Sequence, residues 1–351
     1  MGERPFVTVA PMSSILNLGI VGTGYIADVI ATALRETDRV RLAAVASRRV
    51  EGARDFAARH GGVRVHASWE ELIADPTVQA VYVATPTVAR EAICVGAAQA
   101  GRHVLGDKPF RSLDSLRAIT SACRQSGVAF MDATHFTHHP RTHQLRREMA
   151  ERVGRLEAIR SSFFFPSADR ANIRLQPDKE PAGAIGDMAW YSMRAVAEYA
   201  PSHPAVVRAR GFAKKDAVTG GFVRGAGVVE FADGMTSTWD AGYTVGACLM
   251  DLELLGEKGM ISMDDFVLDW SGGFPIPDVT RPVGFTQRSG LATPSGFIRV
   301  ETPGAKRQAV QMLENFADLT REPNGVAAQE SVRISERTQG LVDTLLANLE
   351  L

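Results

Sequence analysis

An acid and a phenol stand four residues apart in the stretch GAIGDMAWY, residues 183–191. If a helix begins near Gly186, Asp187 and Tyr191 lie on one face of that helix. A carboxylate can orient a neighbouring group and a phenol can give or take a proton, so this pair could carry acid–base chemistry. The same residues also fit a helix start in which Asp187 meets the helix dipole and the rings of Trp190 and Tyr191 are packed in the core.

A glycine-rich loop near the start of the chain favours the catalytic interpretation. The segment GIVGTGYIA contains Gly-x-Gly-x-x-Ala, with Ala27 in the third position, between an expected strand and an expected helix. Glycines at such a turn let the backbone approach a pyrophosphate, whose charge is met by the helix N-terminus. Without that context, the pattern would indicate only a tight turn. We therefore predict a dinucleotide site that includes Gly22, Thr23, Gly24, Tyr25 and Ile26.

The end of the second expected strand, ASRR, discriminates between two cofactors. A site for NAD places an acid there to bind the ribose 2′-hydroxyl, whereas this chain has Ser47, Arg48 and Arg49. A hydroxyl and two guanidinium groups suit a 2′-phosphate, which arginine binds bidentately. The alternative is a solvated helix start with Ser47 as its N-cap. Because no carboxylate competes, the sequence favours NADP(H) over NAD(H).

The elements that must position these residues alternate between strands and helices over the first third of the chain. Apolar strands are expected at residues 15–22, 40–47, 63–67, 80–86, 103–109 and 128–134. Helices are expected at residues 25–36, 50–61, 68–75, 87–101 and 112–127, two of them with N-caps, Ser68 and Ser112. This alternation is typical of an α/β fold with a Rossmann doubly wound parallel sheet, in which ligands bind beyond the carboxyl ends of the strands. Lys108 stands at the carboxyl end of the fifth strand and would lie there.

The pattern changes after about residue 134, where longer strands replace the alternation. Strands are expected at residues 156–166, 205–215, 221–234, 235–245 and 247–259, and helices at 145–154 and 330–351. Asp233 and Gly234 form a strong hairpin signal between two of these strands. The sequence therefore predicts a second, α+β domain with an open, mostly antiparallel sheet.

We predict a chain of three parts. These are a loose tail at residues 1–14, a dinucleotide-binding domain at 15–135, and a substrate-binding and oligomerisation domain at 136–351. The C-terminal helix is a candidate to pack back on the first of these domains. An open sheet face would leave a larger apolar patch in water than a monomer tolerates. We therefore expect a homodimer or homotetramer built through the second sheet.

Composition excludes several classes of function. The 351 residues carry a formal net charge of -1, which favours neither nucleic acid nor a membrane surface as partner. No apolar run approaches the roughly 20 residues that span a bilayer. Cys94, Cys123 and Cys248 have no metal-ligand spacing and fit buried thiols of a cytoplasmic protein. The histidines at residues 135–143 lack a following carboxylate or cysteine, so we expect no metal.

Two motifs taken together, GIVGTGYIA and GDKP, make the chain similar to the glucose–fructose oxidoreductase/inositol dehydrogenase/MocA family. The similarity runs from about Ile15 to the C-terminal helix and implies an N-terminal Rossmann domain followed by a domain with an open, mostly antiparallel sheet. The family's Glu-Lys-Pro motif is Asp-Lys-Pro here, at residues 107–109, and the resemblance implies a cis peptide before Pro109. Arg90 stands where many members carry histidine. The resemblance extends the cofactor site to Thr85, Pro86, Arg90, Asp107 and Lys108.

The later acid-containing motif narrows the resemblance to one branch. Family members usually carry a histidine four residues after the acid, and Tyr191 takes that place here. With a tyrosine in this place, the chain resembles the branch of the family that contains dimeric dihydrodiol dehydrogenases, xylose dehydrogenases and sugar 3-ketoreductases. It implies a carbohydrate-like small molecule as substrate, with hydride transfer between a nicotinamide and a carbinol or carbonyl carbon.

These considerations assign a role to each candidate catalytic residue. Tyr191 is expected to be the general acid or base, and Lys108 to lower the pKa of that phenol. Asp187 would orient the lysine or a substrate hydroxyl, with Arg194 neutralising or supporting it. Candidate substrate contacts are His135, Arg174 and Trp190.

Two other functions stay open at this point. One is a non-catalytic NAD(P)-binding regulatory protein of the same fold, and the other is an isomerase-like or glycosidase-like use of a tightly held cofactor. The lysine and its tyrosine partner, Lys108 and Tyr191, favour the oxidoreductase over both.

Overall fold

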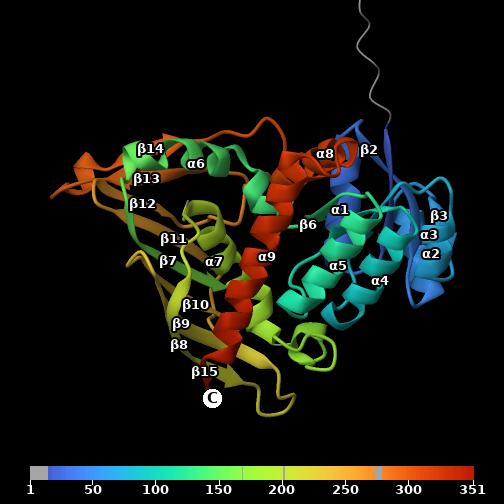
Figure 1. Ribbon diagram of the computed structural model, residues 1–351, viewed down its shortest axis with the longest axis horizontal. Coiled ribbons are helices and arrows are strands. Elements are labelled where there is room, and N and C mark those ends of the chain that lie inside the picture. Colours follow the sequence, from blue (N-terminus) through green and yellow to red (C-terminus); the bar gives the residue numbers. More distant parts are fainter. Residues whose placement is uncertain (1–14, 168, 201, 273–278) are drawn as a thin grey trace, which may run out of the picture.

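The computed structural model describes residues 15–167, 169–200, 202–272 and 279–351 (Figure 1). The predicted tail, residues 1–14, lies outside the described residues. The ribbon has two sheets, one in each half of the molecule, with the long helix α9 (Val326–Ala347) running between them. This helix therefore contacts both halves of the molecule.

The first sheet has six parallel strands in the order β3-β2-β1-β4-β5-β6. This is the strand order of a dinucleotide-binding Rossmann sheet, so the predicted fold of the first domain is confirmed. The strands are β1 (Leu16–Val21), β2 (Val40–Ala46), β3 (Arg64–His66), β4 (Ala80–Val83), β5 (His103–Gly106) and β6 (Phe130–Asp132).

Helices cover both faces of this sheet. They are α1 (Tyr25–Ala33), the 3-10 turn η1 (Leu34–Glu36), α2 (Val50–Arg59), α3 (Trp69–Ala74), α4 (Thr87–Gln99) and α5 (Leu113–Gln125). The predicted N-caps of α3 and α5 are confirmed, because the Ser68 hydroxyl accepts from the Glu71 amide and the Ser112 hydroxyl from the Ser115 amide.

The second sheet has nine strands in the order β14-β13-β12-β11-β7-β10-β9-β8-β15. Its neighbours are antiparallel except β7 with β10 and β8 with β15, so the prediction of a mostly antiparallel sheet is confirmed. The predicted hairpin at Asp233 joins β9 to β10. The strands are β7 (Leu156–Phe164), β8 (Val206–Lys215), β9 (Phe222–Phe231), β10 (Thr236–Gly242), β11 (Leu249–Gly256), β12 (Gly259–Met263), β13 (Gly284–Arg288), β14 (Ile298–Glu301) and β15 (Leu349–Glu350).

The helix α7 (Gly183–Tyr199) lies on the inner face of the second sheet, and every one of its residues is buried. It begins at Gly183, three residues before the predicted start. Close packing depends on Gly225 in β9, because a Cβ atom there would collide with the side chain of Ile185. The other helical segments of this half are η2 (His135–His138), α6 (Pro140–Arg152), η3 (Ile173–Leu175), η4 (Pro294–Gly296) and α8 (Gln308–Arg321).

The two C-terminal helices join the halves. Helix α9 packs on α7 and also on α5 and β6 of the first domain. Its Gln339 accepts from the Phe110 amide at 3.0 Å, and its Glu336 accepts from the Thr120 hydroxyl at 2.8 Å. Helix α8, which the sequence did not predict, packs its Phe316 into the apolar cluster beneath α1. Both C-terminal helices therefore help to fix the geometry between the sheets.

The outer face of the second sheet carries polar side chains. Arg224 pairs with Asp240 at 2.8 Å, and Arg160 with Glu253 at 3.5 Å. This sheet also exposes Phe212 and Val228, so its outer surface is mixed and not purely apolar, and an oligomer through it stays a prediction. The expectation of three buried thiols is also corrected, because Cys248 is exposed.

In the parts of the chain that the structure describes, no helix is long and apolar enough to cross a membrane.

Candidate active site

A cavity of about 380 Å³ opens where the carboxyl ends of β4 and β5 face the start of α7. Ala84, Lys108 and Ala133 line it from the first domain, and Asp187 and Tyr191 line it from the second. This is the position at which Rossmann sheets bind their ligands.

Lys108 and Asp187 form a buried ion pair at the floor of this cavity. The Lys108 ammonium donates to Asp187 Oδ1 at 2.6 Å and to the Asp187 carbonyl oxygen at 2.9 Å. The peptide between Lys108 and Pro109 is cis, as the family resemblance implied. A Cβ atom on Gly186 would lie 3.1 Å from Pro109 Cγ, so a glycine there lets this turn pack on the first turn of α7.

Asp187 has two further partners in the same cavity. Arg174 Nε donates to Asp187 Oδ2 at 2.6 Å, and the Tyr243 hydroxyl donates to the same oxygen at 3.0 Å. Burial alone would raise the pKa of Asp187, but Arg174 and Lys108 outweigh it and hold that pKa below its usual range. The carboxylate is therefore ionised at neutral pH, and it orients the lysine as predicted.

Arg194 does not take the predicted part in this cluster. Its guanidinium donates to Asp132 at 2.5 Å and to Glu198 at 2.9 Å, on the side of α7 that faces β6 and α9. The expectation that Arg194 supports Asp187 is therefore wrong. Arg174, which was expected to contact substrate, is the arginine that pairs with the acid.

Tyr191 presents its ring to the lysine and its hydroxyl to a histidine. The Lys108 ammonium lies 4.5 Å from the ring centroid, and the Tyr191 hydroxyl lies 3.4 Å from His135 Nε2. Burial raises the pKa of Tyr191 and Lys108 offsets only part of that rise. Lys108 lowers the pKa of this phenol, as predicted, but burial raises it by more, and Tyr191 is a neutral phenol at pH 7.

The three candidate substrate contacts separate into two groups. His135 and Arg174 line the cavity. Trp190 is fully buried in the core, where its indole nitrogen donates to the Thr134 hydroxyl at 2.8 Å, and it is not among the described residues that line the cavity. Sequence reasoning missed Tyr243, which follows β10 and is marked in the sequence only as an aromatic residue at a strand end.

The neighbouring histidines have protein partners. His138 Nδ1 lies 2.9 Å from the Asn315 side-chain nitrogen, and His139 Nδ1 accepts from the Arg141 amide at 3.0 Å as the N-cap of α6. Within residues 15–351, apart from the undescribed positions, no group of histidine, cysteine and acidic side chains is arranged to hold a metal ion.

The glycine loop has the conformation that a dinucleotide needs. Gly22 has φ 109°, which favours glycine, and a Cβ atom there would lie 2.5 Å from the Ala84 carbonyl oxygen. A Cβ atom on Gly24 would meet open space, so the start of α1 is accessible from outside. Thr85 Oγ1 is a buried hydroxyl without a hydrogen-bond partner in the described structure. An accessible helix N-terminus beside an unpartnered hydroxyl fits a dinucleotide. Tyr25 and Ile26 border the same cavity.

The polar group predicted to meet a 2′-phosphate lies at the end of β2. Arg49 is the N-cap of α2, so the alternative that Ser47 caps this helix is wrong. Thr23 donates to the Ser47 hydroxyl at 3.4 Å, which joins this segment to the glycine loop. Arg48 and Arg49 are exposed, and neither guanidinium has an ion pair within the part of the chain that is described.

Arg90 and Asp107 line the cavity beside Lys108. The Arg90 guanidinium is buried and donates to the carbonyl oxygens of Thr85 and Pro109, so it joins two loops of the site. Burial raises the pKa of Asp107, although Arg90 and Lys108 oppose the rise. Pro86 is the N-cap of α4 and continues the loop that carries Thr85.

Two family models match the chain in succession. Residues 16–134 match an oxidoreductase family with an NAD-binding Rossmann fold, and residues 143–262 match the GFO/IDH/MocA C-terminal domain. The chain therefore belongs to the GFO/IDH/MocA family of NAD(P)-binding oxidoreductases.

Characterised relatives resemble the chain over much of its length. The NADP⁺-dependent D-xylose 1-dehydrogenase 2 of Haloferax volcanii is 30% identical over 227 residues, which are 64% of this chain and 69% of that protein. The trans-1,2-dihydrobenzene-1,2-diol dehydrogenase of Xenopus laevis is 26% identical over 333 residues, 88% of this chain and 98% of that protein. A 3-ketoreductase from Actinomadura kijaniata, solved with NADP and TDP-benzene, has the same fold, with a TM-score of 0.83 at 22% identity over 96% of this chain and 98% of the other.

Proposed function

We propose that the protein is an NADP(H)-dependent oxidoreductase that interconverts a carbonyl and a carbinol of a sugar, sugar derivative or cyclic diol. The observation that carries the proposal is the placement of Tyr191 and Lys108 together on one buried cavity beside the glycine loop. The bound nicotinamide supplies the hydride in this chemistry. The protein must supply the proton and hold the substrate.

Tyr191 is the proposed proton donor. Because burial keeps its phenol protonated at neutral pH, Tyr191 can give a proton to a carbonyl oxygen held in the cavity. The nearby Lys108 ammonium stabilises the phenolate that remains, and Asp187 holds the ammonium in place. A neutral phenol is the protonation state that reduction of a carbonyl requires of its proton donor.

The cavity walls suit a ring that carries hydroxyl groups. Arg174 has a side chain 42% exposed although it pairs with Asp187, so its remaining N–H groups are available to substrate oxygens. Phe163, Phe165 and Met250 also line the cavity and give it an apolar surface that can pack on the carbon face of a ring. Xylose and dihydrobenzenediol, the substrates that name two of the relatives, both have this character.

Arg48 and Arg49 are the proposed ligands of the 2′-phosphate of NADP(H). Their guanidinium groups are exposed and without ion pairs among the described residues, and they follow the strand whose end meets the ribose in Rossmann folds. Replacing both by serine should weaken NADPH binding about tenfold or more and leave NADH binding unchanged. Equal losses for both cofactors, measured by fluorescence titration, would contradict this assignment.

The decisive experiment compares Tyr191→Phe with Tyr243→Phe. Both changes remove one hydroxyl from the cavity, but only Tyr191 is the proposed acid. With NADPH and a panel of keto-sugars, aldoses and cyclic diketones, Tyr191→Phe should lower kcat about 100-fold to 10,000-fold. Tyr243→Phe should lower it less than about tenfold, since Asp187 keeps its two cationic partners.

NADPH binding is the control in both variants and should not change. Turnover retained by Tyr191→Phe would refute the proton-donor role. NADPH binding by the unaltered protein with no reduction of any compound in the panel would favour the regulatory, non-catalytic alternative.

A further inference from the structure

The first residue of α8 has a side-chain amide whose orientation is fixed by its surroundings. Gln308 is buried, and its Nε2 lies 2.8 Å from the carbonyl oxygen of Val267 and 2.8 Å from Nδ1 of His135. A backbone carbonyl can only accept a hydrogen bond, so the amide group that faces Val267 must be the NH₂. The reverse orientation would place two oxygens 2.8 Å apart with no hydrogen between them.

The orientation of Gln308 decides which nitrogen of His135 carries the proton. An NH₂ group aimed at His135 Nδ1 requires that nitrogen to be an acceptor, so in the neutral ring the hydrogen is on Nε2. Burial lowers the pKa of His135 to about 4, and the ring is therefore neutral at pH 7. The protonated Nε2 is the nitrogen that faces the Tyr191 hydroxyl, 3.4 Å away.

A donor at His135 Nε2 also determines how the Tyr191 hydroxyl can be used. The phenol oxygen accepts from the imidazole, so its own hydrogen must point elsewhere, and the cavity is the space that both residues border. Hydrogen bonds of this kind are often long before a substrate binds and tighten in the complex. When the phenol proton leaves, the same N–H and the Lys108 ammonium face the phenolate.

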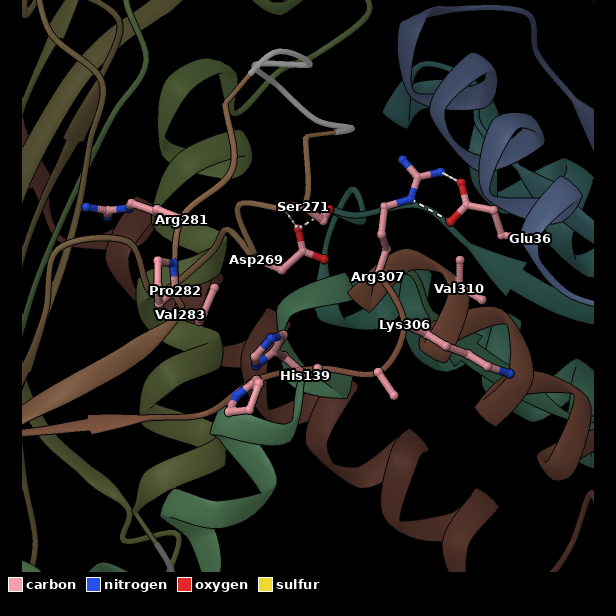
Figure 2. A pocket seen from close by; sticks show the side chains of 13 residues that line it. Glu36, His139, Asp269, Ser271, Arg281, Pro282, Val283, Lys306, Arg307 and Val310 are labelled. Atoms are coloured by element: carbon pink, nitrogen blue, oxygen red, sulfur yellow. Dashed lines mark hydrogen bonds and ion pairs between the residues drawn. The ribbon is translucent and has the colours of Figure 1, made fainter.

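The start of α8 is held on two sides, which keeps Gln308 in place. Figure 2 shows Asp269 and Arg307 beside a cavity of about 490 Å³ between the two halves of the molecule. Asp269 Oδ2 accepts from the Gln308 backbone amide at 2.7 Å, and Arg307 Nε donates to Glu36 of the first domain at 2.8 Å. The helix start is therefore tied to both domains.

We propose that Gln308 is a positioning residue that fixes His135 as its Nε2–H tautomer, so that His135 donates to the Tyr191 oxygen and directs the phenol proton into the cavity. This inference rests on the proposed role of Tyr191 as proton donor. It assigns functions to a glutamine and a histidine that lie 173 positions apart in the sequence.

The first test reads the tautomer directly and requires no turnover. Nitrogen NMR of protein labelled at histidine, with the His135 signals assigned from the spectrum of His135→Asn, distinguishes a protonated from an unprotonated ring nitrogen. At pH 7 the unaltered protein should show His135 protonated on Nε2 alone. A ring protonated on Nδ1, or on both nitrogens, would overturn the proposal whatever the protein catalyses.

The second test changes Gln308 and measures both the tautomer and catalysis. In Gln308→Glu the new carboxylate attracts a proton to Nδ1, and we expect a protonated Nδ1 together with a loss of about tenfold or more in kcat for reduction, with KM changed less than about threefold. Gln308→Met, which has no donor, should give a mixture of tautomers and a smaller loss of kcat. Gln311→Met, three residues further along α8, is the matched control and should leave both measurements unchanged.

The two readouts separate the possible failures. If the tautomer changes in Gln308→Glu while kcat does not, the positioning role is refuted and the proposed function stands. If the unaltered protein has the expected tautomer but reduces no carbonyl compound, the proposed function fails, and with it the catalytic use of Gln308.

Discussion

Two buried arginine–aspartate clusters, built from the same residue types, serve opposite purposes in this molecule. Arg141, which is 1% exposed, donates to Asp265 Oδ1 at 2.6 Å and to the backbone carbonyl oxygens of Asp265, Phe266 and Leu268 at 3.0–3.1 Å. Arg174 donates to Asp187 at the same 2.6 Å, yet 42% of its side chain is exposed, and it lines the candidate active-site cavity. The hydrogen-bond donors of Arg141 are occupied by the chain, and we call its cluster with Asp265 the closed cluster. Arg174 keeps donors that face the cavity, and we call its cluster with Asp187 the open cluster.

The comparison shows how a stable cluster can support a reactive one. The turn that Arg141 holds also contains Val267, whose carbonyl oxygen orients Gln308 and, through it, His135. The closed cluster therefore fixes one wall of the site. The open cluster, with Asp187 at its centre, supplies the charges that face the cavity.

The largest effect is expected when the closed cluster is broken. Arg141→Met removes several donors at once and leaves buried acceptors without partners, so the free energy of unfolding should fall by about 3–5 kcal/mol. Chemical denaturation followed by circular dichroism measures this loss. Arg141→Lys should recover only part of the lost stability, since one ammonium group cannot donate to all the oxygens that the guanidinium reaches. A loss below about 1 kcal/mol in Arg141→Met would remove the distinction between the clusters.

A change in the open cluster should cost less stability and affect substrate binding more. Arg174→Met removes one partner of Asp187, which keeps Lys108 and Tyr243, so the free energy of unfolding should fall by only about 1 kcal/mol. The KM for the carbonyl substrate should rise roughly tenfold to thirtyfold with kcat reduced less, because a substrate contact is lost and the acid remains. An unchanged KM in steady-state assays would contradict a substrate role for Arg174.

The open cluster was partly visible in the sequence and the closed one was not. Lys108 and Asp187 could be predicted because one follows a strand of a recognisable parallel sheet and the other stands in a short glycine-rich motif. Arg141 and Asp265 are 124 positions apart, and neither belongs to a pattern that a single sequence displays. Their pairing depends on how the second sheet folds against α6.

Two neighbouring residues of α7 also show how far the sequence alone can predict the site. Trp190 and Tyr191 are equally aromatic and adjacent, yet a rotation of about 100° per residue directs one into the core and the other to the cavity. The spacing of Asp187 and Tyr191 predicted their shared face. Spacing could not predict which aromatic residue borders the cavity, because every residue of α7 is buried.

The smallest predicted effect concerns mild acid, which should act near the closed cluster. Burial lowers the pKa of His139, two residues before Arg141, to about 4, whereas an unfolded histidine titrates near 6.5. Between these values the unfolded chain binds a proton that the folded chain does not, so the stability that His139 contributes above about pH 6.5 is lost as the pH falls toward 4. The Asp187 carboxylate, with its lowered pKa, does not titrate in this window.

His139→Asn isolates this contribution. Asparagine can still accept from the Arg141 amide as the N-cap of α6 but has no proton to gain, so folding is preserved while the titration is removed. Thermal unfolding of the unaltered protein should shift to lower temperature between pH 7 and pH 5, and His139→Asn should lose on the order of 1 kcal/mol less over the same interval. Identical pH dependence in the two proteins would show that His139 has the same pKa in the folded and the unfolded chain, and the acid sensitivity would then have to arise at other buried histidines, such as His138.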